Sequence, residues 1–159
     1  MPKYNSIQSG DTISGGMASV HIFVDDVEWD AFWIKSYDVT SHIAMGSIKS
    51  IGSQKSIPVP GEVTVDGNLN GYYGTRVFSY IHTRYKDTNK YPKVEMLIHE
   101  EDPASNRGAR VLEVKNVFFT DATIGNSDDS SQAMEASTPF QAYDYNIIQD
   151  FNDLSRERV

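Results

Sequence analysis

The chain has 159 residues, four histidines and no cysteine, and its formal net charge at pH 7 is −8. The length favours a single domain over residues 1–159, which at this size buries roughly 70% of its unfolded surface and needs no covalent cross-link. The absence of cysteine excludes disulfide scaffolds, thiolate zinc sites and cysteine nucleophiles. No apolar run approaches about 18 residues, so a membrane-spanning helix is excluded as well. The acidic balance argues against tight DNA binding, although by itself it also keeps an ordinary domain soluble.

The first segment, 1–16, is polar and rich in Ser and Gly, which predicts a flexible N-terminal arm. It lacks the apolar core of a signal peptide, so we expect a protein made and used in a cytoplasm, or in an assembly built there. Residues 19–24 predict a short strand, and Asp25-Asp26 predicts a tight turn without the usual glycine. A long strand is expected over 27–45. Its apolar side consists of Val27, Trp29, Ala31 and Trp33, and its other side carries the acids Asp26, Glu28 and Asp30.

The alternation becomes ambiguous near Ile34, which indicates a β-bulge there. The segment 46–61 that follows is rich in Ser and Gly, contains two prolines and shows no sustained period. A connection of this length without secondary structure is uncommon inside a compact domain, so it is either disordered or ordered by something outside the monomer. Residues 62–73 alternate again and predict a strand. The apolar face of that strand consists of Val63, Val65 and Leu69.

One convincing helical period lies at about 75–86, with Thr75 as a candidate cap. The residues expected on its core-facing side are Val77, Phe78, Ile81 and Tyr85. The remaining elements are strands at 93–101, 109–125 and about 133–145, followed by a polar C-terminal tail at 150–159. The last strand presents one shared face, which consists of Met134, Ala136, Thr138, Phe140 and Ala142.

These elements predict an antiparallel, β-rich α+β fold with one helix packed on the strands, a long N-terminal hairpin and an extended loop. A small sheet has two edges whose backbone donors and acceptors are unpaired. A monomer has to cover those edges, whereas an oligomer can use them to continue the sheet into a neighbouring copy.

The row of acids formed by Asp26, Glu28 and Asp30, called the acidic row below, is the first candidate for chemistry. Calcium loops need oxygen ligands that converge around a turn, whereas alternate residues of an extended strand point the same way about 7 Å apart. Glycoside hydrolysis by paired carboxylates needs an apolar pocket that raises one pKa, and nothing around this row indicates such a pocket. A solvated face is therefore the default interpretation of the acidic row, ahead of a metal site.

The rest of the sequence carries no enzyme signature either. The histidines show no metal-binding spacing and are expected as half-buried strand or helix residues: His21, His42, His82 and His99. The sequence has no P-loop, no dinucleotide fingerprint and no G-x-S-x-G motif. Most aromatic residues fall at alternating strand positions, where core packing explains them better than stacking on sugars or bases. We therefore expect no catalytic residue, no metal and no cofactor.

From the helix onward, the sequence resembles the tail tube proteins of contractile phages and of phage-derived tail particles of Gram-positive bacteria. The resemblance rests on the order and spacing of three stretches, and the opening DTISG is also similar. The three stretches are FSYIHTRYKDTNKYPKVEMLIHEED, RGARVLEVKNVFFTDATIGNSD and EASTPFQAYDY. The similarity spans about half of the chain, because residues 25–60 match only in character, as a long hairpin and loop.

The resemblance implies a β-barrel or sandwich with one flanking helix, and hexameric rings stacked into a hollow tube inside a contractile sheath. It implies a virion structural protein without enzymatic activity, located in the tail of a virion or phage-like particle that is assembled in a bacterial cytoplasm. Its implied partners are further copies of the chain, the tail sheath protein, the tape measure protein, and the baseplate or initiator and terminator proteins. In a phage the tube conducts DNA during genome ejection, whereas in a tail-like bacteriocin (tailocin) it opens a path across the target's envelope, and the sequence leaves both open.

Under this interpretation, edge strands would be closed by ring neighbours, and the loop 46–61 would be ordered by the adjacent ring. The candidate inter-ring residues of that loop are Ser47, Lys49, Gln54, Lys55, Pro58 and Pro60. If the acidic row faces the lumen, it gives a negative lining that repels DNA phosphates within about 8 Å at physiological salt. Two alternatives remain: a monomeric β-domain that binds carbohydrate or peptide through Trp29 or Trp33, and a secretion-system tube protein.

Overall fold

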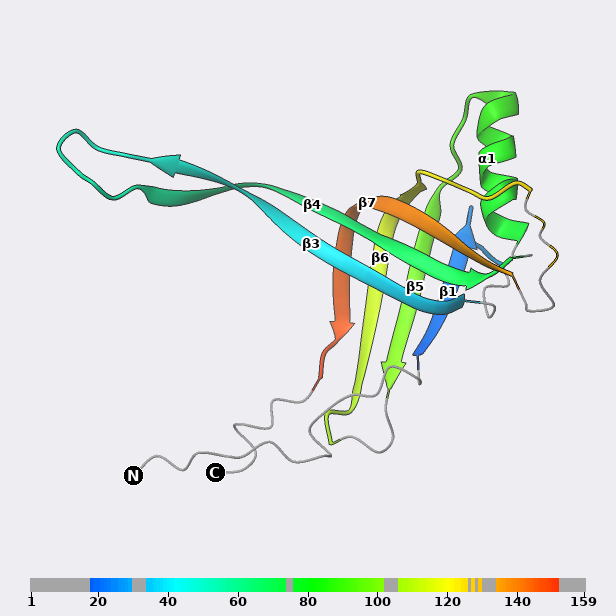
Figure 1. Cartoon of the computed structure of the whole chain (residues 1–159). Helices are drawn as coiled ribbons and strands as arrows, with labels where there is room; N and C mark the ends of the chain where they lie inside the picture. Colours follow the sequence, from blue (N-terminus) through cyan, green and yellow to red (C-terminus); the bar gives the residue numbers. More distant parts are fainter. Residues whose placement is uncertain are drawn as a thin grey trace.

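The computed structural model describes residues 18–29, 34–73, 76–101, 106–125, 127, 129 and 134–151. The arm expected at 1–16, residues 30–33 of the expected long strand, Thr75 and most of the expected C-terminal tail lie outside these residues. The described chain forms seven strands and one helix (Figure 1), and the predicted β-rich α+β fold is confirmed. The elements are β1 Ala18–Val24, β2 Val27–Trp29, β3 Ile34–Ile48, β4 Ile57–Tyr72, α1 Arg76–Thr88, β5 Val94–Glu101, β6 Ala109–Phe119 and β7 Glu135–Gln149.

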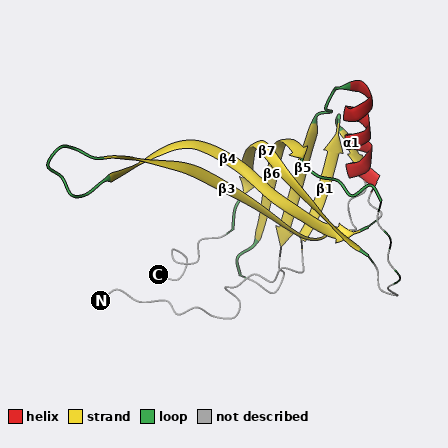
Figure 2. Cartoon of the chain, turned by 45° about the horizontal axis from the view of Figure 1, so that its top comes forward, coloured by secondary structure: helices red, strands yellow, loops and turns green. Residues whose placement is uncertain are grey.

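The seven strands form one antiparallel sheet in the order β2-β1-β5-β6-β7-β4-β3. Strand β7 joins two parts of this sheet, because residues 135–142 pair with β4 and residues 140–149 pair with β6. Figures 1 and 2 show that β3, β4 and the first half of β7 cross over β1, β5 and β6. The sheet therefore folds into two layers, as in a sandwich. We call β3, β4 and 135–142 the β3–β4–β7 layer, and the other strands with 143–149 the β1–β5–β6 layer.

The hydrophobic core lies between the two layers and against the helix. The β3–β4–β7 layer contributes Leu69 and Phe140, which are 1% exposed, and the β1–β5–β6 layer contributes Met96, which is fully buried. Phe119 packs between Phe78 of α1 and Phe140 of β7, with ring centroids 4.9 and 6.3 Å from its own. Both layers and the helix thus meet around one aromatic group.

Helix α1 has the amphipathic period expected from the sequence, and Val77, Phe78 and Ile81 are buried. Tyr85 was expected on the same face, but it is 51% exposed and its ring lies edge-on to Tyr91, 6.2 Å between centroids. The reason is that Tyr85 lies in the last turn of the helix, where its neighbour is the loop before β5 and not a core strand. His82 Nε2 donates a hydrogen bond of 2.7 Å to the Phe119 carbonyl and ties the helix to β6. Among the described residues, no helix is long and apolar enough to span a membrane.

The long strand expected over 27–45 is wrong, because β2 and β3 are separate strands that lie at opposite ends of the sheet order. β2 pairs with β1, whereas β3 pairs with β4. Both strands alternate in hydrophobicity, so the alternation runs on across the break and hides it. The bulge expected near Ile34 is confirmed by a register shift between Ile34 and Ser36.

The expected two-residue turn between β1 and β2 is confirmed. Asp25 and Asp26 have φ angles of 50° and 66°, the left-handed region that this kind of hairpin turn requires. Asp25 anchors the turn, since its carboxylate accepts hydrogen bonds from Arg84 Nη1 at 2.5 Å and from the Lys93 backbone N–H at 3.1 Å. The Arg84 hydrogen bond, followed by that from Lys93, lowers the pKa of Asp25 below its ordinary value of 3.8. The Asp26 side chain is 83% exposed, and its Oδ1 lies 4.0 Å from Lys93 Nζ.

We expect Asp25→Ala to lower the melting temperature of the chain and Asp26→Gly to raise it. The first change removes the hydrogen bonds that tie the turn to α1 and β5, whereas the second relieves a left-handed backbone that costs a non-glycine residue on the order of 1 kcal/mol. Because the pKa of Asp25 is lowered on folding, its stabilisation is present above pH 3.8 and is lost as the pH falls through the folded-state pKa. Thermal unfolding followed by circular dichroism between pH 2 and pH 7 measures the change in melting temperature of each variant and its dependence on pH. Equal changes in melting temperature for Asp25→Ala and Asp26→Gly would contradict this account.

Beyond the body of the fold, β3 and β4 continue as a projecting two-stranded arm (Figure 1). Every residue of 40–64 is exposed except the half-buried Ser53, and we call this segment the hairpin arm. The expectation of a connection without secondary structure over 46–61 is wrong for its two ends, because β3 and β4 pair from Met45 and Pro60 to Ile48 and Ile57. The two prolines made this part of β4 resemble a loop in the sequence. Prolines are tolerated there because β4 has no second partner strand before Val65 in the described residues, so that edge needs no N–H donor.

Gly67 marks the closest approach of the backbone in the β3–β4–β7 layer. It is paired with Val39 on one side and Phe140 on the other. A Cβ atom at Gly67 would lie 2.1 Å from the Asp38 carbonyl oxygen and 2.6 Å from Phe140 Cζ. The position therefore excludes any side chain, and the Phe140 ring lies directly over the backbone of β4.

Candidate assembly surfaces

The acidic row lies at the β1–β2 end of the molecule, beside α1. Glu28 Oε1 lies 2.7 Å from His21 Nδ1, and both side chains are about half exposed. Trp29, between the acids in sequence, stacks on Tyr80 of α1 with ring centroids 4.7 Å apart. Asp30 and Trp33 lie outside the described residues. The described part of the row is a solvated edge, and Trp29 packs one face of its ring on Tyr80, so that face is not available to a sugar.

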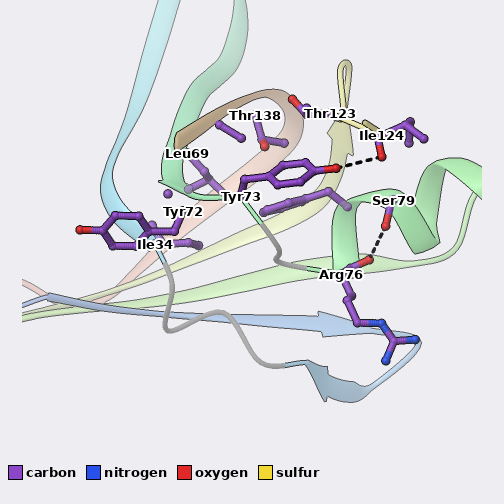
Figure 3. A pocket seen from close by; sticks show the side chains of 12 residues that line it. Ile34, Leu69, Tyr72, Tyr73, Arg76, Ser79, Thr123, Ile124 and Thr138 are labelled. Carbon is purple, nitrogen blue, oxygen red and sulfur yellow. Dashed lines mark hydrogen bonds between the residues drawn. The ribbon is translucent and has the colours of Figure 1, made fainter. Parts of the chain in front are cut away.

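The described residues contain no group of three His, Asp or Glu side chains that could hold a metal ion. A pocket of about 200 Å³ lies where β4 runs into α1 (Figure 3). Its described lining has no carboxylate or histidine; there Tyr73 donates a hydrogen bond to the Ile124 carbonyl at 3.2 Å, and the Arg76 side chain points away. The described lining therefore lacks the imidazole and the carboxylate that acid–base catalysis commonly uses.

The hairpin arm exposes an unusual amount of apolar surface. Ile43 and Val63 are paired across the arm and are 53% and 56% exposed. They lie on the same side of the strand pair as the buried Val65. The apolar side that faces the core in the body of the fold is therefore exposed to solvent in the arm. The exposed apolar side chains of the arm are Ile43, Met45, Ile48, Ile51, Ile57, Val59 and Val63. Burying one such side chain fully is worth about 1.5–3 kcal/mol, so this arm gains several kcal/mol if another surface covers it.

The tip of the arm, 49–56, differs from the rest of the chain in charge. Of the residues expected to make inter-ring contacts, Ser47 and Pro58 face each other in the strand pair, and Lys49, Gln54 and Lys55 lie in the tip. No acid occurs between Val39 and Gly61, although the whole chain has a net charge of −8. The tip is therefore a basic, apolar-flanked end on an acidic protein.

Two strand edges of the β1–β5–β6 layer are open. β2 covers β1 only at 22–24, so in the described chain no strand lies beside residues 18–21 on that side. At the other side of the layer, residues 143–149 of β7 pair with β6 alone, because the pairing of β7 with β4 stops at Ala142. The two edges lie at opposite sides of one layer. An edge of one copy can therefore pair with the opposite edge of a second copy, and the pairing can repeat.

The outward face of the β3–β4–β7 layer is polar, and this was not predicted from the sequence. Three cross-strand rows build it, and we call it the polar face: Thr40, Asp66 and Gln141; Asp38, Asn68 and Pro139; Ser36, Asn70 and Ser137. The neighbouring row in each strand carries the buried Leu69 and Phe140, so the polar face points away from the core. The alternation of Ser, Asp, Thr and His in 36–42, and of Thr, Asp and Asn in 64–70, was the available signal.

The two layers are also tied by a hydrogen bond at the end that carries residue 150. Tyr37 of β3 donates a hydrogen bond to the Glu100 carboxylate of β5. Burial, followed by this hydrogen bond, raises the pKa of Tyr37 far above its ordinary value, so the hydroxyl remains protonated and donating. Arg110 binds Asp150 Oδ1 through Nε at 2.9 Å and stacks on the ring of Phe151, which holds the chain end against β6.

A family model described as phage tail tube protein matches residues 5–149 of this chain. The matched range contains all seven strands and helix α1. A search of curated protein sequences found no match for the chain.

Solved structures share the fold over nearly the whole chain. The tube-terminating cap of the anti-feeding prophage is 14% identical, with a TM-score of 0.66 over 92% of this chain and 96% of that one. The SPP1 tail tube is 14% identical, with a TM-score of 0.61 over 92% and 84%. The PVC sheath–tube complex, an extracellular contractile injection system in its extended state, is 16% identical, with a TM-score of 0.57 over 87% and 92%. Likeness at these identities demonstrates a common fold.

Proposed function

The chain belongs to the phage tail tube protein family, and from this premise we propose that it is the structural subunit of the inner tube of a contractile tail. Copies of the chain form hexameric rings, and the rings stack into a hollow tube inside a sheath. The observation that carries this proposal is the pair of open edges on opposite sides of the β1–β5–β6 layer. They can form a heterologous contact, in which one edge of each copy pairs with the opposite edge of the next copy. Such a contact gives a ring when the rotation between neighbours closes.

The hairpin arm supports stacking of the rings. It projects from the body past β7 (Figure 1), so it reaches beyond its own subunit. Its apolar side chains and its basic tip have no cover in the single chain. We infer that the arm, including Ser47, Lys49 and Lys55, packs on a subunit of the adjacent ring. The sheath, tape measure, baseplate and terminator proteins are the further partners that this assembly requires.

The tube is located in the tail of a phage or phage-like particle, where it conducts DNA or opens a channel in the target's envelope. The fold is shared by a phage tail tube and by parts of two injection systems, so the fold alone does not separate the two cargoes.

Disulfide trapping tests the ring contact, because the chain has no cysteine of its own. Ser19→Cys is combined in turn with a cysteine at each position from 143 to 149, and assembled protein is oxidised and run on a denaturing gel without reductant. We expect at least one combination to give a ladder that ends at six subunits, since opposite edges of neighbours lie side by side. Either cysteine alone is the matched control and should give no product larger than a dimer.

Negative-stain microscopy of the same samples provides the reference for this test. Rings or tubes without any ladder would show that the subunits join through other surfaces. Protein that stays monomeric at high concentration would contradict the proposed function itself.

A further inference from the structure

We propose that the pocket where β4 runs into α1 receives the tip of the hairpin arm of a copy in the adjacent ring, and that Ile51 is the side chain that enters it. We call this pocket the α1 pocket. The inference rests on the proposed function and adds to it the surface that receives the arm.

The tip of the arm presents one apolar side chain in a fixed position. Residues 50–53 form a β-turn, in which the Ser53 N–H donates a hydrogen bond of 3.1 Å to the Ser50 carbonyl. Gly52 occupies the third position of the turn with a φ of 84°, the left-handed conformation that favours glycine there. Ile51 beside it is fully exposed, although turns are usually built from Gly, Pro, Asn, Asp and Ser. The turn therefore holds an isoleucine outward, where it gains most from a cover supplied by another copy.

The α1 pocket has the size and the lining for such a side chain. Cavities of about 150 Å³ hold a benzene molecule, so a pocket of about 200 Å³ has room for the four carbon atoms of an isoleucine side chain. The hydroxyls of Tyr73 and Ser79 already donate to the carbonyls of Ile124 and Arg76, and the Arg76 side chain points away (Figure 3). The apolar residues of the lining are Ile34, Leu69, Phe78, Ile124 and Ala136.

The tip and the α1 pocket lie at opposite ends of the same strand pair. The tip precedes Ile57, the first residue of β4, whereas Gly71 and Tyr72 at the other end of β4 line the pocket. The 16 residues of β4, at about 3.3 Å each, span about 50 Å, so the tip does not reach the pocket of its own chain. A copy displaced along the strand pair brings its tip to the pocket of the next copy. Each copy then gives one tip and receives one, and the contact repeats along the tube.

Charge favours the same pairing. The tip carries Lys49 and Lys55 and no acid. The connection between β6 and β7, which lines one side of the α1 pocket, carries Asp121 and Asp129. No lysine or arginine occurs over 116–155. A segment whose charges are all positive thus meets one whose charges are all negative, an arrangement that orients two surfaces as they dock.

Disulfide trapping between rings tests the contact, because the chain has no cysteine of its own. Ile51→Cys is combined with Thr123→Cys, at an exposed residue of the pocket lining, and assembled tubes are oxidised and run on a denaturing gel without reductant. We expect a ladder that continues past six subunits, since these links run from ring to ring. The matched control pairs Ile51→Cys with Lys86→Cys, in the last turn of α1 and about 15 Å along the helix from Arg76, and should give no ladder.

A substitution at the tip tests the apolar part of the contact. Ile51→Asp is expected to raise the protein concentration at which rings stack by about tenfold or more, because a buried isoleucine is lost and a carboxylate has to enter an apolar site. Ile51→Leu keeps the apolar side chain and should stack as the unaltered chain does. Sedimentation over a concentration series, with electron microscopy of the pellets, measures the change.

Reversal of charge tests the polar part. Lys49→Glu with Lys55→Glu should leave rings intact and weaken their stacking, and mixing in the reciprocal changes Asp121→Lys and Asp129→Lys on the same chain should restore it. Normal stacking by Ile51→Asp, equal ladders from the pairs at 123 and 86, or no recovery on the reciprocal change would overturn the α1 pocket as the receiving site while the tube assignment stands. Absence of tubes from the unsubstituted chain is a separate result that removes the proposed function.

Discussion

A chain in which residues 44–62 are replaced by Asn-Gly is expected to fold and to lose the ability to form tubes. Ile43 and Val63 are directly paired, so a two-residue Asn-Gly turn can join them with the backbone twist that a hairpin favours. The replaced residues are exposed apart from Ser53, which is half-buried, so the melting temperature should change little. Without the arm, the contact between stacked rings loses its apolar side chains. Each of them contributes about 1.5–3 kcal/mol when it is fully buried, so each contact loses several kcal/mol. Electron microscopy of the shortened and the full chain at the same protein concentration shows whether tubes form.

The control for this experiment is Ser50→Ala, which keeps the full arm and alters one exposed hydroxyl. It should assemble as the unaltered chain does. Normal tubes from the shortened chain would show that the arm has no part in stacking. A shortened chain that fails to fold would show instead that the arm supports the body, contrary to its exposure.

The largest effect on stability is expected from Gly67→Ala. The added methyl group would lie 2.1 Å from the Asp38 carbonyl oxygen and 2.6 Å from the Phe140 ring, so both β3 and β7 have to move away from β4. Overpacking a core costs about 1–3 kcal/mol and occasionally more, and a clash with backbone belongs at the upper end of that range. Chemical denaturation of the variant measures the loss of unfolding free energy.

Two other glycines of the same hairpin give a graded control series. A Cβ atom at Gly61 would lie 3.2 Å from the Ala44 carbonyl oxygen, and one at Gly46 would lie 3.8 Å from that of Val59. Gly61→Ala should therefore cost little and Gly46→Ala almost nothing, because neither position has a left-handed φ angle. If all three variants lose the same stability, the close approach at Gly67 is not what limits the fold.

The elements that follow from local chemistry were predictable from the sequence. Val77, Phe78 and Ile81 recur with the period of a helix, and Asp25-Asp26 stands between two alternating segments. The end of the helix was less predictable, because the fate of Tyr85 depends on the loop that happens to pack beside it. The family resemblance is confirmed by the match over 5–149.

What the sequence could not show is which strands pair over long distances. Nothing local to β7 tells that its first half belongs to one layer and its second half to the other. The break between β2 and β3 is hidden for the same reason. Alternating hydrophobicity indicates which side of a strand faces the core, but it does not indicate which strand pairs with it. Pro58 and Pro60 made a strand look like a loop, because proline is compatible with a strand only where one edge is free. The polar face was not predicted, because the acidic row is the more conspicuous charged pattern in the sequence. The polar face differs from the rest of the chain in its shortage of lysine and arginine.

The hairpin arm leaves the body in one direction (Figure 1), and in the proposed tube this gives the stack a sense of direction. One extremity of the proposed tube displays free arms, and the opposite extremity displays only the sites that receive them. Incoming subunits meet different chemistry at the two extremities, so elongation proceeds at unequal rates and nucleation has to occur on a template that matches one of them. A plug that fits the leading tip cannot fit the trailing one, so the particle needs two dissimilar caps for a filament built from a single kind of chain.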